Sequence, residues 1–534
     1  MEANFRSSMT SMSWLHSWAG VLIGSLLFAM FWMGSLSVFD REIDRWMMPG
    51  TRLAPAAIVR PVKLDGAITG QIQRLTEGAS QWSIRLPDTR VPALELRWRS
   101  EASKTFERRY LHPQSGAVLE GTDTLAGSGF IVPFHFSLHL KWMDLGHWLT
   151  GLAGMAMLLL VVSGVVIHRK IFANFFLFRP EKHLLRASLD LHHLSGVLAM
   201  PFHFAIALSG LVILFSLYWP VAYQVAYQAA YPQASDARQM FVAEGLGQYR
   251  RIRANKPGQP LGSLDAMRAN AEKQWQGGQA DFIRVWNPGD ASGYVELRRS
   301  HADRLTMNLD QLYLDAATGT LLKRFEAAPV MGVQRFITGL HRIQFEHWTL
   351  RWLYFLAGLS GCVLIATGLL FWLESRRASH ARKGLAGLRL VEALTVFSVS
   401  GIMIATLVFF VSNRLLPAAA SLGGYVRSAI EVWAFYLAWL ATLAHAALRG
   451  RAAWREQTWA VAALALLAVL LNWASTGQHP VLALGQKLWA VAGMDLALLA
   501  SAGLAAGTAR HLGRKAASRQ ADQPAPQTRG SDHA

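Results

Sequence analysis

Cysteine is almost absent from this chain: Cys362 is its single thiol among 534 residues. One cysteine excludes a disulfide framework, and it excludes the cysteine-rich sites that hold zinc or iron–sulfur clusters. The sequence also has no G-x-G-x-x-G motif that opens a helix after a strand, so it carries no fingerprint for FAD or NAD. A metal or redox group in this protein therefore needs ligands other than thiolates.

Charged residues are also scarce, at 16% of the chain, whereas 52% of the residues are hydrophobic. An apolar run of about 20 residues is long enough to cross the hydrocarbon core of a bilayer. The first such run is too long and too rich in Gly and Trp for a secretory signal, so we interpret it as a retained anchor. We expect eight transmembrane helices, at about 14–39, 146–167, 190–219, 350–373, 390–412, 428–448, 457–474 and 484–508.

Acidic residues are outnumbered, with 34 Asp and Glu against 52 Lys and Arg. The basic residues gather in alternate short loops, for example 168–186 and 374–389, as the positive-inside rule expects. This pattern predicts a multi-pass protein of the bacterial inner membrane with both termini in the cytoplasm. The hydrophilic segments 40–135 and 220–340 would then be periplasmic. No basic stripe with interleaved aromatic residues appears, so nucleic-acid binding is not expected.

The first and third spans are copies of one element. Residues 15–39, "LHSWAGVLIGSLLFAMFWMGSLSVF", align without a gap with residues 191–215 when shifted by 176 positions. The shift places His16 on His192, and it places a glycine on a glycine near each end. Each copy therefore carries a histidine at its entrance.

The segments after these spans also match. Each outer segment contains a helix-like stretch (64–75 and 261–275), a strand-like piece, and a hairpin that ends in Ser/Thr-Gly, where glycine suits the positive-φ position. The return spans also match when the alignment includes a gap of two residues, and this alignment pairs His139 with His341. Each unit is thus a span, an outer domain and a returning span.

Twelve of the 18 histidines surround spans 1–4. Placing an ionisable side chain in a membrane span costs free energy, so such a residue is a candidate functional residue. His192 and His203 are 11 residues apart, so on an ideal helix they share a face at a separation of about 16 Å. Proteins that bind haem b between helices use such spacing, because neutral imidazole ligates haem iron. Zinc or copper is the alternative, but no clustered carboxylates or thiols accompany these histidines.

These residues resemble the PepSY-associated transmembrane proteins. The motifs "WLHSWAGVLIG", "YLDAATGTLLKR" and "LH…LAG…TGLLFW" carry the resemblance, which covers residues 10–375. It implies periplasmic PepSY-like domains, and the family includes inner-membrane ferric-siderophore reductases whose haem is held by transmembrane histidines. Domain one departs from the pattern, with His112 where domain two has Asp315.

The predicted fold is an α-helical membrane protein of about eight transmembrane helices, with a tandem repeat and two small α+β PepSY-like periplasmic domains. The expected segments are the first helix (1–39), PepSY-like domain 1 (40–135), helices 2 and 3 (136–219), PepSY-like domain 2 (220–340), helix 4 (341–375), helices 5–8 (376–509) and a disordered cytoplasmic tail (510–534).

The resulting hypothesis is a haem b oxidoreductase with two haems. Electrons would enter from an external donor, quinol or a cytoplasmic flavoprotein, and would reduce a periplasmic acceptor such as a ferric siderophore. The candidate ligands are His16 with His192 for the inner haem and His139 with His341 for the outer haem. Substitutes for the outer haem are His203, His147 and His347, and pairing of His16 with His168 within one unit is also open. The two layers could lie more than about 30 Å apart. A permease or accessory subunit for siderophore or metal uptake, or a haem-free PepSY scaffold, remains open.

Overall fold

The computed structural model describes residues 2–54, 61–100, 105–168, 179, 183–233, 236–383 and 387–521. Its contacts divide the chain into two compact units. The first unit comprises Met1–Gly368 with Leu484–Ala490, and the second comprises Leu369–Ala483 with Val491–Ala534. Most of the basic loop between spans 2 and 3, and the tail beyond residue 521, lie outside the described residues.

Seven helices of the described chain are long and apolar enough to cross a membrane, which makes this a multi-pass membrane protein. Their spans are Met9–Ser37 in α1, Trp142–Ile167, which includes all of α5 (Leu145–Ile167), Trp348–Arg377 in α13, Gly387–Leu415 across α14 and α15, Arg427–Arg449 (α16), Ala452–Thr476 (α17) and Trp489–Lys515 in α19. The expected third span is different, because it is a bent pair of helices.

This bent pair consists of α6 (Leu184–Leu198) and α7 (Met200–Ile213), which meet at an angle of 65°. Pro201 occupies the start of α7. Proline has no N–H to donate and its ring clashes with the preceding turn, so a helix breaks there. The expectation that His192 and His203 share the face of one ideal helix is therefore wrong, because the bend separates the two segments.

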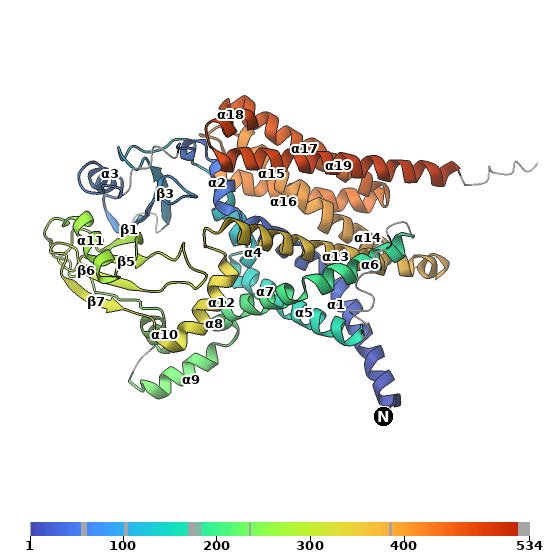
Figure 1. The fold of residues 1–534 in the computed structure, drawn as a ribbon, viewed down its shortest axis with the longest axis horizontal. Helices are drawn as coiled ribbons and strands as arrows, with labels where there is room; N and C mark the ends of the chain where they lie inside the picture. The colour runs from blue at the N-terminus through green and yellow to red at the C-terminus, as the bar shows by residue number, and fades with distance from the viewer. Residues whose placement is uncertain are drawn as a thin grey trace, which may run out of the picture. The chain divides into compact units, whose positions relative to one another are not determined.

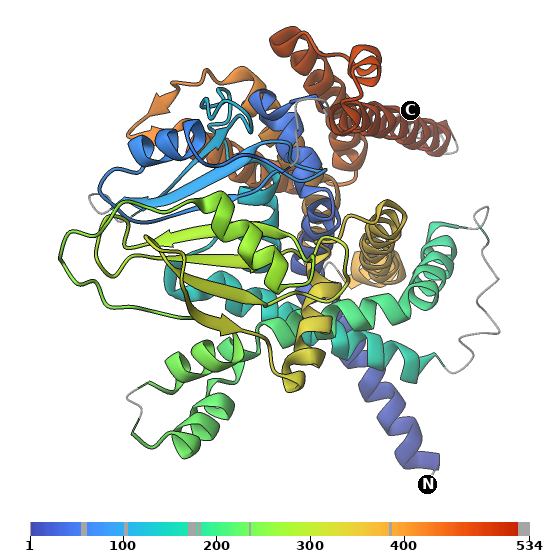
Figure 2. The same cartoon turned by 60° about the vertical axis from the view of Figure 1, so that its left-hand side comes forward.

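The outer segments of both repeats build a single antiparallel sheet of seven strands, in the order β3-β2-β1-β4-β5-β6-β7 (Figures 1 and 2). The strands are β1 (Ala79–Arg85), β2 (Leu94–Ser100), β3 (Phe106–Leu111), β4 (Ala280–Trp286), β5 (Tyr294–Arg299), β6 (Gln311–Asp315) and β7 (Leu321–Phe325). The expected two separate small domains are thus joined, because β1 pairs with β4. We call this part the sheet domain.

The junction of the two repeats is symmetric at the level of single residues. Ile84 of β1 lies opposite its repeat mate Ile283 of β4. The helices α3 (Ala67–Leu75) and α11 (Leu264–Gln274) exchange carboxylates near their N-termini. Asp265 accepts hydrogen bonds from the Leu64 and Asp65 amides, each at 2.9 Å, and Asp65 accepts from the Leu264 amide at 2.9 Å. Each repeat therefore satisfies backbone donors of the other.

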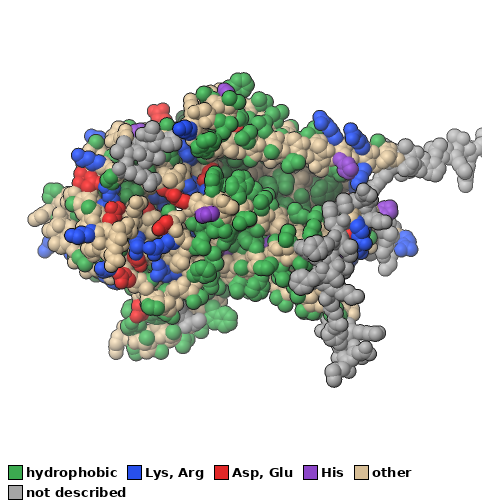
Figure 3. Space-filling model, in the orientation of Figure 1, with side chains coloured by type: hydrophobic (Ala, Val, Ile, Leu, Met, Phe, Trp, Pro, Cys, Tyr) green, Lys and Arg blue, Asp and Glu red, His purple; other side chains and the backbone are tan. Residues whose placement is uncertain are grey.

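One hydrophobic core serves both repeats. It joins the inward side chains of α3 and α11 to alternate residues of the strands, including Trp82, Ile84, Leu96 and Leu297. Alternation places the remaining strand residues on the opposite face of the sheet. Figure 1 shows α3 and α11 at the end of the sheet domain away from α1, and Figure 3 shows charged side chains of both signs over this domain, in contrast to the hydrophobic surface of the helices.

The two predicted hairpins differ in how much of their strand pairing is formed. Gly116 and Gly319 both have φ of +71°, which confirms the positive-φ positions expected from the sequence. The second hairpin is complete, since β6 pairs with β7. The first is reduced to an isolated bridge between Leu111 and Val118.

The second unit is helical and contains buried polar pairs. Asn413 of α15 (Ile402–Leu415) donates to Glu431 of α16 (Arg427–Arg449) at 3.0 Å. Asn472 of α17 (Ala452–Thr476) donates to Asp495 of α19 (Trp489–Ala521) at 3.2 Å. Because α19 continues to Ala521, residues 510–521 are helical where the sequence predicted the start of a disordered tail.

Candidate functional site: two pairs of histidines

The first histidine pair lies far along α1 from the sheet domain, and we call it the remote pair. His16 of α1 packs on Gly164 of α5 (Leu145–Ile167), and a Cβ on that glycine would stand 3.3 Å from the ring. His192 of α6 packs in the same way on Gly368 of α13 (Trp348–Lys383), at 3.0 Å. Both imidazoles therefore lie so close to a glycine that an added Cβ would make a tight contact with the ring.

The second pair lies where the helices meet the sheet domain, and we call it the sheet-side pair. His135 of α4 (Val132–Ser137) packs on Gly34 of α1, and His341 of α12 (Gly332–Arg342) packs on Gly210 of α7. A Cβ on either glycine would approach the ring to 2.8 and 3.0 Å, respectively. Gly34 and Gly210 are the repeat mates that the sequence alignment identified.

The Nδ1 atom of each ring is held by an oxygen close to the facing glycine. His135 bonds the Met30 carbonyl at 2.9 Å and His192 bonds the Leu364 carbonyl at 2.8 Å, in each case four residues before the glycine. His16 and His341 instead contact the hydroxyls of Ser163 and Ser209, both at 2.9 Å and one residue before the glycine. A carbonyl only accepts, so Nδ1 of His135 and His192 carries the proton and Nε2 keeps its lone pair.

Within each pair the two rings lie close together, with 84° between the ring planes of His16 and His192 and 29° between those of His135 and His341. The ring centres of His16 and His192 are 6.4 Å apart, and those of His135 and His341 are 6.1 Å apart. A metal–imidazole bond is about 2 Å long, so two imidazoles that bind one metal from opposite sides have ring centres about 6 Å apart. Both pairs therefore have the spacing of two axial ligands.

The donor set suits haem iron better than a bare metal ion. Haem iron needs only two axial ligands from the protein, since the macrocycle supplies the others. In the described part of the chain, no group of three or more His, Cys, Asp or Glu side chains is placed to hold a metal ion. In number and in ring spacing, the two imidazoles of each pair thus match the ligands that a haem iron takes from a protein.

The structure pairs His341 with His135 rather than with the predicted His139. The residue before His139, Leu138, ends α4 in a left-handed conformation, and His139 itself has φ of +52°. The His139 ring packs on Phe130, with ring centres 5.5 Å apart. The sequence alignment aligned the two "LH" dipeptides across this turn and so missed the true repeat mate.

Two other predicted histidines have local partners. His147 stacks on Phe136 with ring centres 5.7 Å apart, and its Nδ1 lies 3.5 Å from Asp144. His168 stacks on His193, with ring centres only 4.1 Å apart. The His168–His193 rings are too close together to hold a metal between them.

His203 is fully buried, as its depth in the third span predicted. Its Nε2 lies 3.2 Å from the Ser360 hydroxyl, and its ring centre lies 5.6 Å from that of Phe31 in α1. Phe31 precedes Gly34 by one helical turn. His203 and Phe31 therefore lie between the two histidine pairs.

A buried ion-pair cluster fixes the sheet domain to the helix ends beside the sheet-side pair. Glu42 of α2 (Asp40–Met47) binds Arg351 of α13 at 2.6 Å and Arg90 of the β1–β2 loop at 2.9 Å. Burial tends to raise the pKa of Glu42, but the two arginines outweigh it and lower the pKa to about 2. Arg351 also donates to the Val38 carbonyl at the end of α1, at 2.8 Å.

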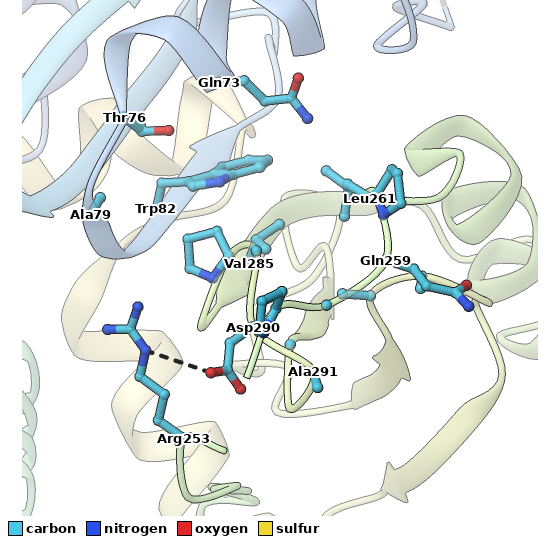
Figure 4. A pocket seen from close by; sticks show the side chains of 18 of the residues that line it. Gln73, Thr76, Ala79, Trp82, Arg253, Gln259, Leu261, Val285, Asp290 and Ala291 are labelled. Carbon is cyan, nitrogen blue, oxygen red and sulfur yellow. Dashed lines mark ion pairs between the residues drawn. The ribbon is translucent and has the colours of Figure 1, made fainter. Parts of the chain in front are cut away.

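A cavity of about 700 Å³ opens on the helix-covered side of the sheet, next to Trp82 and the loop after β4 (Figure 4). Asp290 at its edge is held by Arg253 at 3.8 Å and by the Ser292 hydroxyl at 2.6 Å. None of the four paired histidines lines it. The cavity is thus separate from the histidine pairs.

Comparison with known proteins places the chain in a family. Residues 13–375 match the model of the PepSY-associated TM region, and the chain belongs to this family. It is also 31% identical over 359 residues to Uncharacterized protein PA4219 of Pseudomonas aeruginosa. That match covers 63% of this chain and 86% of the relative. The family match, residues 13–375, includes both histidine pairs.

Proposed function

We propose that this protein is a haem b oxidoreductase of the bacterial inner membrane that reduces a ferric siderophore on the periplasmic side. The observation that supports it most is the geometry of the two histidine pairs: rings 6.4 and 6.1 Å apart, each backed by a glycine and each with Nδ1 engaged. In this proposal His16 and His192 hold one haem, and His135 and His341 hold the other. Haem b, when bound, supplies one-electron chemistry.

The protein's own residues orient the ligands. The carbonyls of Met30 and Leu364 fix the tautomers of His135 and His192, so that Nε2 of each ring keeps a lone pair that could bind a metal. The serines at positions 163 and 209 perform the same task for the other two rings. The glycines let the Cε1 atom of each ring approach the neighbouring helix closely.

The two pairs are arranged along the path that electrons must follow. His16 and Gly34, which face the two pairs from α1, are 18 residues apart, or about 27 Å along a straight helix. Phe31 and His203 occupy the interval, with ring centres 5.6 Å apart. We place the termini in the cytoplasm, so an external quinol or flavoprotein would donate at the remote pair. The sheet domain would be periplasmic, beside the sheet-side pair.

Rapid mixing of the reduced protein with a ferric siderophore tests this function. The purified protein is reduced with dithionite, freed of excess reductant, and mixed with a ferric tris-hydroxamate in the presence of a ferrous-specific chelator. We expect reoxidation of the protein and appearance of the ferrous complex in equal electron amounts. A reduced protein that stays reduced with ferric siderophores of different chemical classes would exclude the proposed acceptor.

A further inference from the structure

Two matching groups of charged side chains lie on the face of the sheet opposite its hydrophobic core. In the first, Glu95 contacts Arg97 at 3.1 Å and Arg85 at 3.8 Å. The repeat mates form the second group, in which Glu296 contacts Arg298 at 2.5 Å and Arg284 at 3.7 Å. Their strand neighbours Leu96 and Leu297 point into the core, so all six charged side chains share the other face. We call the four arginines the arginine patch.

The carboxylates of these groups are buried, whereas the guanidinium groups reach the surface. The side chains of Glu95 and Glu296 are only 7% and 2% exposed. Those of the arginines are exposed by 38% for Arg85, 55% for Arg97, 26% for Arg284 and 44% for Arg298. Burial would raise the pKa of Glu95, but Arg41, Arg97 and Arg85 outweigh it and lower the pKa to about 2. Two negative charges thus offset two of four positive charges, and the surface remains positive.

Aromatic rings hold part of this patch in place. Arg284 and Arg298 both lie over the ring of Phe282, at 5.0 and 4.9 Å, and Arg284 also lies over Trp286 at 5.1 Å. Stacked guanidinium groups keep their in-plane N–H donors available for a ligand. Because side-chain entropy has already been lost, a ligand that accepts these hydrogen bonds loses less free energy on binding.

The patch lies on the side of the sheet that leads to the sheet-side histidines. On the same face, Glu95 contacts Arg41 of α2 at 3.8 Å, beside the helix ends. Residue Arg41 follows the end of α1 closely, and α1 carries Gly34, the glycine that faces His135, so the first group of the patch is connected through α2 to the sheet-side pair.

We propose that the arginine patch binds the acceptor, and that the acceptor is a negatively charged ferric chelate. This inference rests on the proposed function and adds the charge class of its substrate. Arginine recognises carboxylate and catecholate oxygens through paired charge-assisted hydrogen bonds, which a neutral chelate of the same size accepts more weakly. The buried glutamates orient the guanidinium groups and leave their outer donors to the ligand.

Gallium(III) complexes test the binding without electron transfer, because gallium(III) replaces iron(III) in such chelates and is not reduced. Equilibrium binding to the full-length purified protein is measured for an anionic gallium tris-catecholate and a neutral gallium tris-hydroxamate. We expect the anionic complex to bind more tightly and to weaken as salt is added. The double variant Arg97→Gln/Arg298→Gln should lower its affinity about tenfold or more and leave the neutral complex unchanged.

Arg324→Gln is the matched control. Arg324 is as exposed as Arg298, at 44%, but lies opposite Leu312 in the register and hence on the core-side face. Equal affinities for both complexes, or equal effects of the control and the double variant, would overturn the inference. Separate mixing with the ferric tris-catecholate tests the reductase: tight gallium binding without ferric reduction would support the patch and contradict the proposed function.

Discussion

The imidazole of His341 lies directly against Gly210, where an added Cβ would stand 3.0 Å from Cε1 of the ring. Its repeat mate, Gly34, makes the same contact with His135. The contact joins α12 to α7 and α4 to α1, so one geometry is used twice in the two repeats. The four ring–glycine contacts define the candidate site more sharply than the histidines alone.

A methyl group at Gly210 should displace the His341 ring. We expect Gly210→Ala to lose the haem of the sheet-side pair while it keeps that of the remote pair, measured by pyridine haemochromogen per mole of protein. Alanine favours a helix over glycine by about 1 kcal/mol, so the backbone itself should not suffer. The control is Gly503→Ala in α19, where an added Cβ meets nothing within 4 Å. Equal haem contents in the two variants would contradict the ring–glycine contact.

Single replacements distinguish His135 from His139 as the partner of His341. The rings of His135 and His341 are 6.1 Å apart, whereas His139 packs on Phe130. We therefore expect His135→Ala to lower the haem content or convert one haem from a low-spin to a high-spin spectrum. His139→Ala should retain the spectrum of the unmodified protein. The reverse outcome would restore the pairing that the sequence repeat predicts.

The exchanged carboxylates at the repeat junction should contribute to stability. Loss of an N-terminal cap costs a helix about 1 kcal/mol. Asp265→Ala should therefore lower the free energy of unfolding of the sheet domain by roughly 1–2 kcal/mol, because two amides lose their acceptor. Thermal unfolding monitored by tryptophan fluorescence gives this value. Asp303→Ala, whose side chain is 80% exposed, should leave the midpoint unchanged, and a similar drop in both variants would argue against the cap.

Asp44 should make stability depend on pH. Complete burial raises the pKa of Asp44 from 3.8 to about 6, although Arg41 opposes the shift. Between these pH values the unfolded chain has released a proton that the folded protein keeps, so stability falls as the pH rises from about 4 to about 6.

Asp44→Asn removes that contribution. Its stability relative to the unmodified protein should rise over the same window, by on the order of 2 kcal/mol, and stay level above it. Thermal melts from pH 4 to pH 8 measure the difference. A difference that does not change with pH would show that Asp44 has an ordinary pKa.

The sequence predicted the elements better than their assembly. Apolar runs located the spans, and the helices, strands and positive-φ glycines of the outer segments follow local patterns. The pairing of β1 with β4 was not predictable, because Ile84 and Ile283 are ordinary strand residues whose register depends on the packing of both repeats. Pro201 lies within the third apolar run, and apolar content alone does not distinguish a straight span from a bent one.

The candidate site was predicted in part for a similar reason. The repeat identified His16, His192 and His341, which the structure brings into pairs, and it also identified the glycines that face them. It missed His135, because the turn that ends α4 at Leu138 changes the spacing between the two copies. The glycine repeat is the signal that points to it, because Gly34, the repeat mate of Gly210, faces His135.

The visible spectrum of the purified protein, before and after dithionite, tests the central claim most directly. We predict a Soret band, sharp reduced α and β bands, and one haem b for each histidine pair. Single replacement of His16, His135, His192 or His341 should remove one of them, and replacement of His203 should remove none. A colourless protein from cells grown with ample iron and haem would contradict the account and favour a haem-free scaffold or a permease.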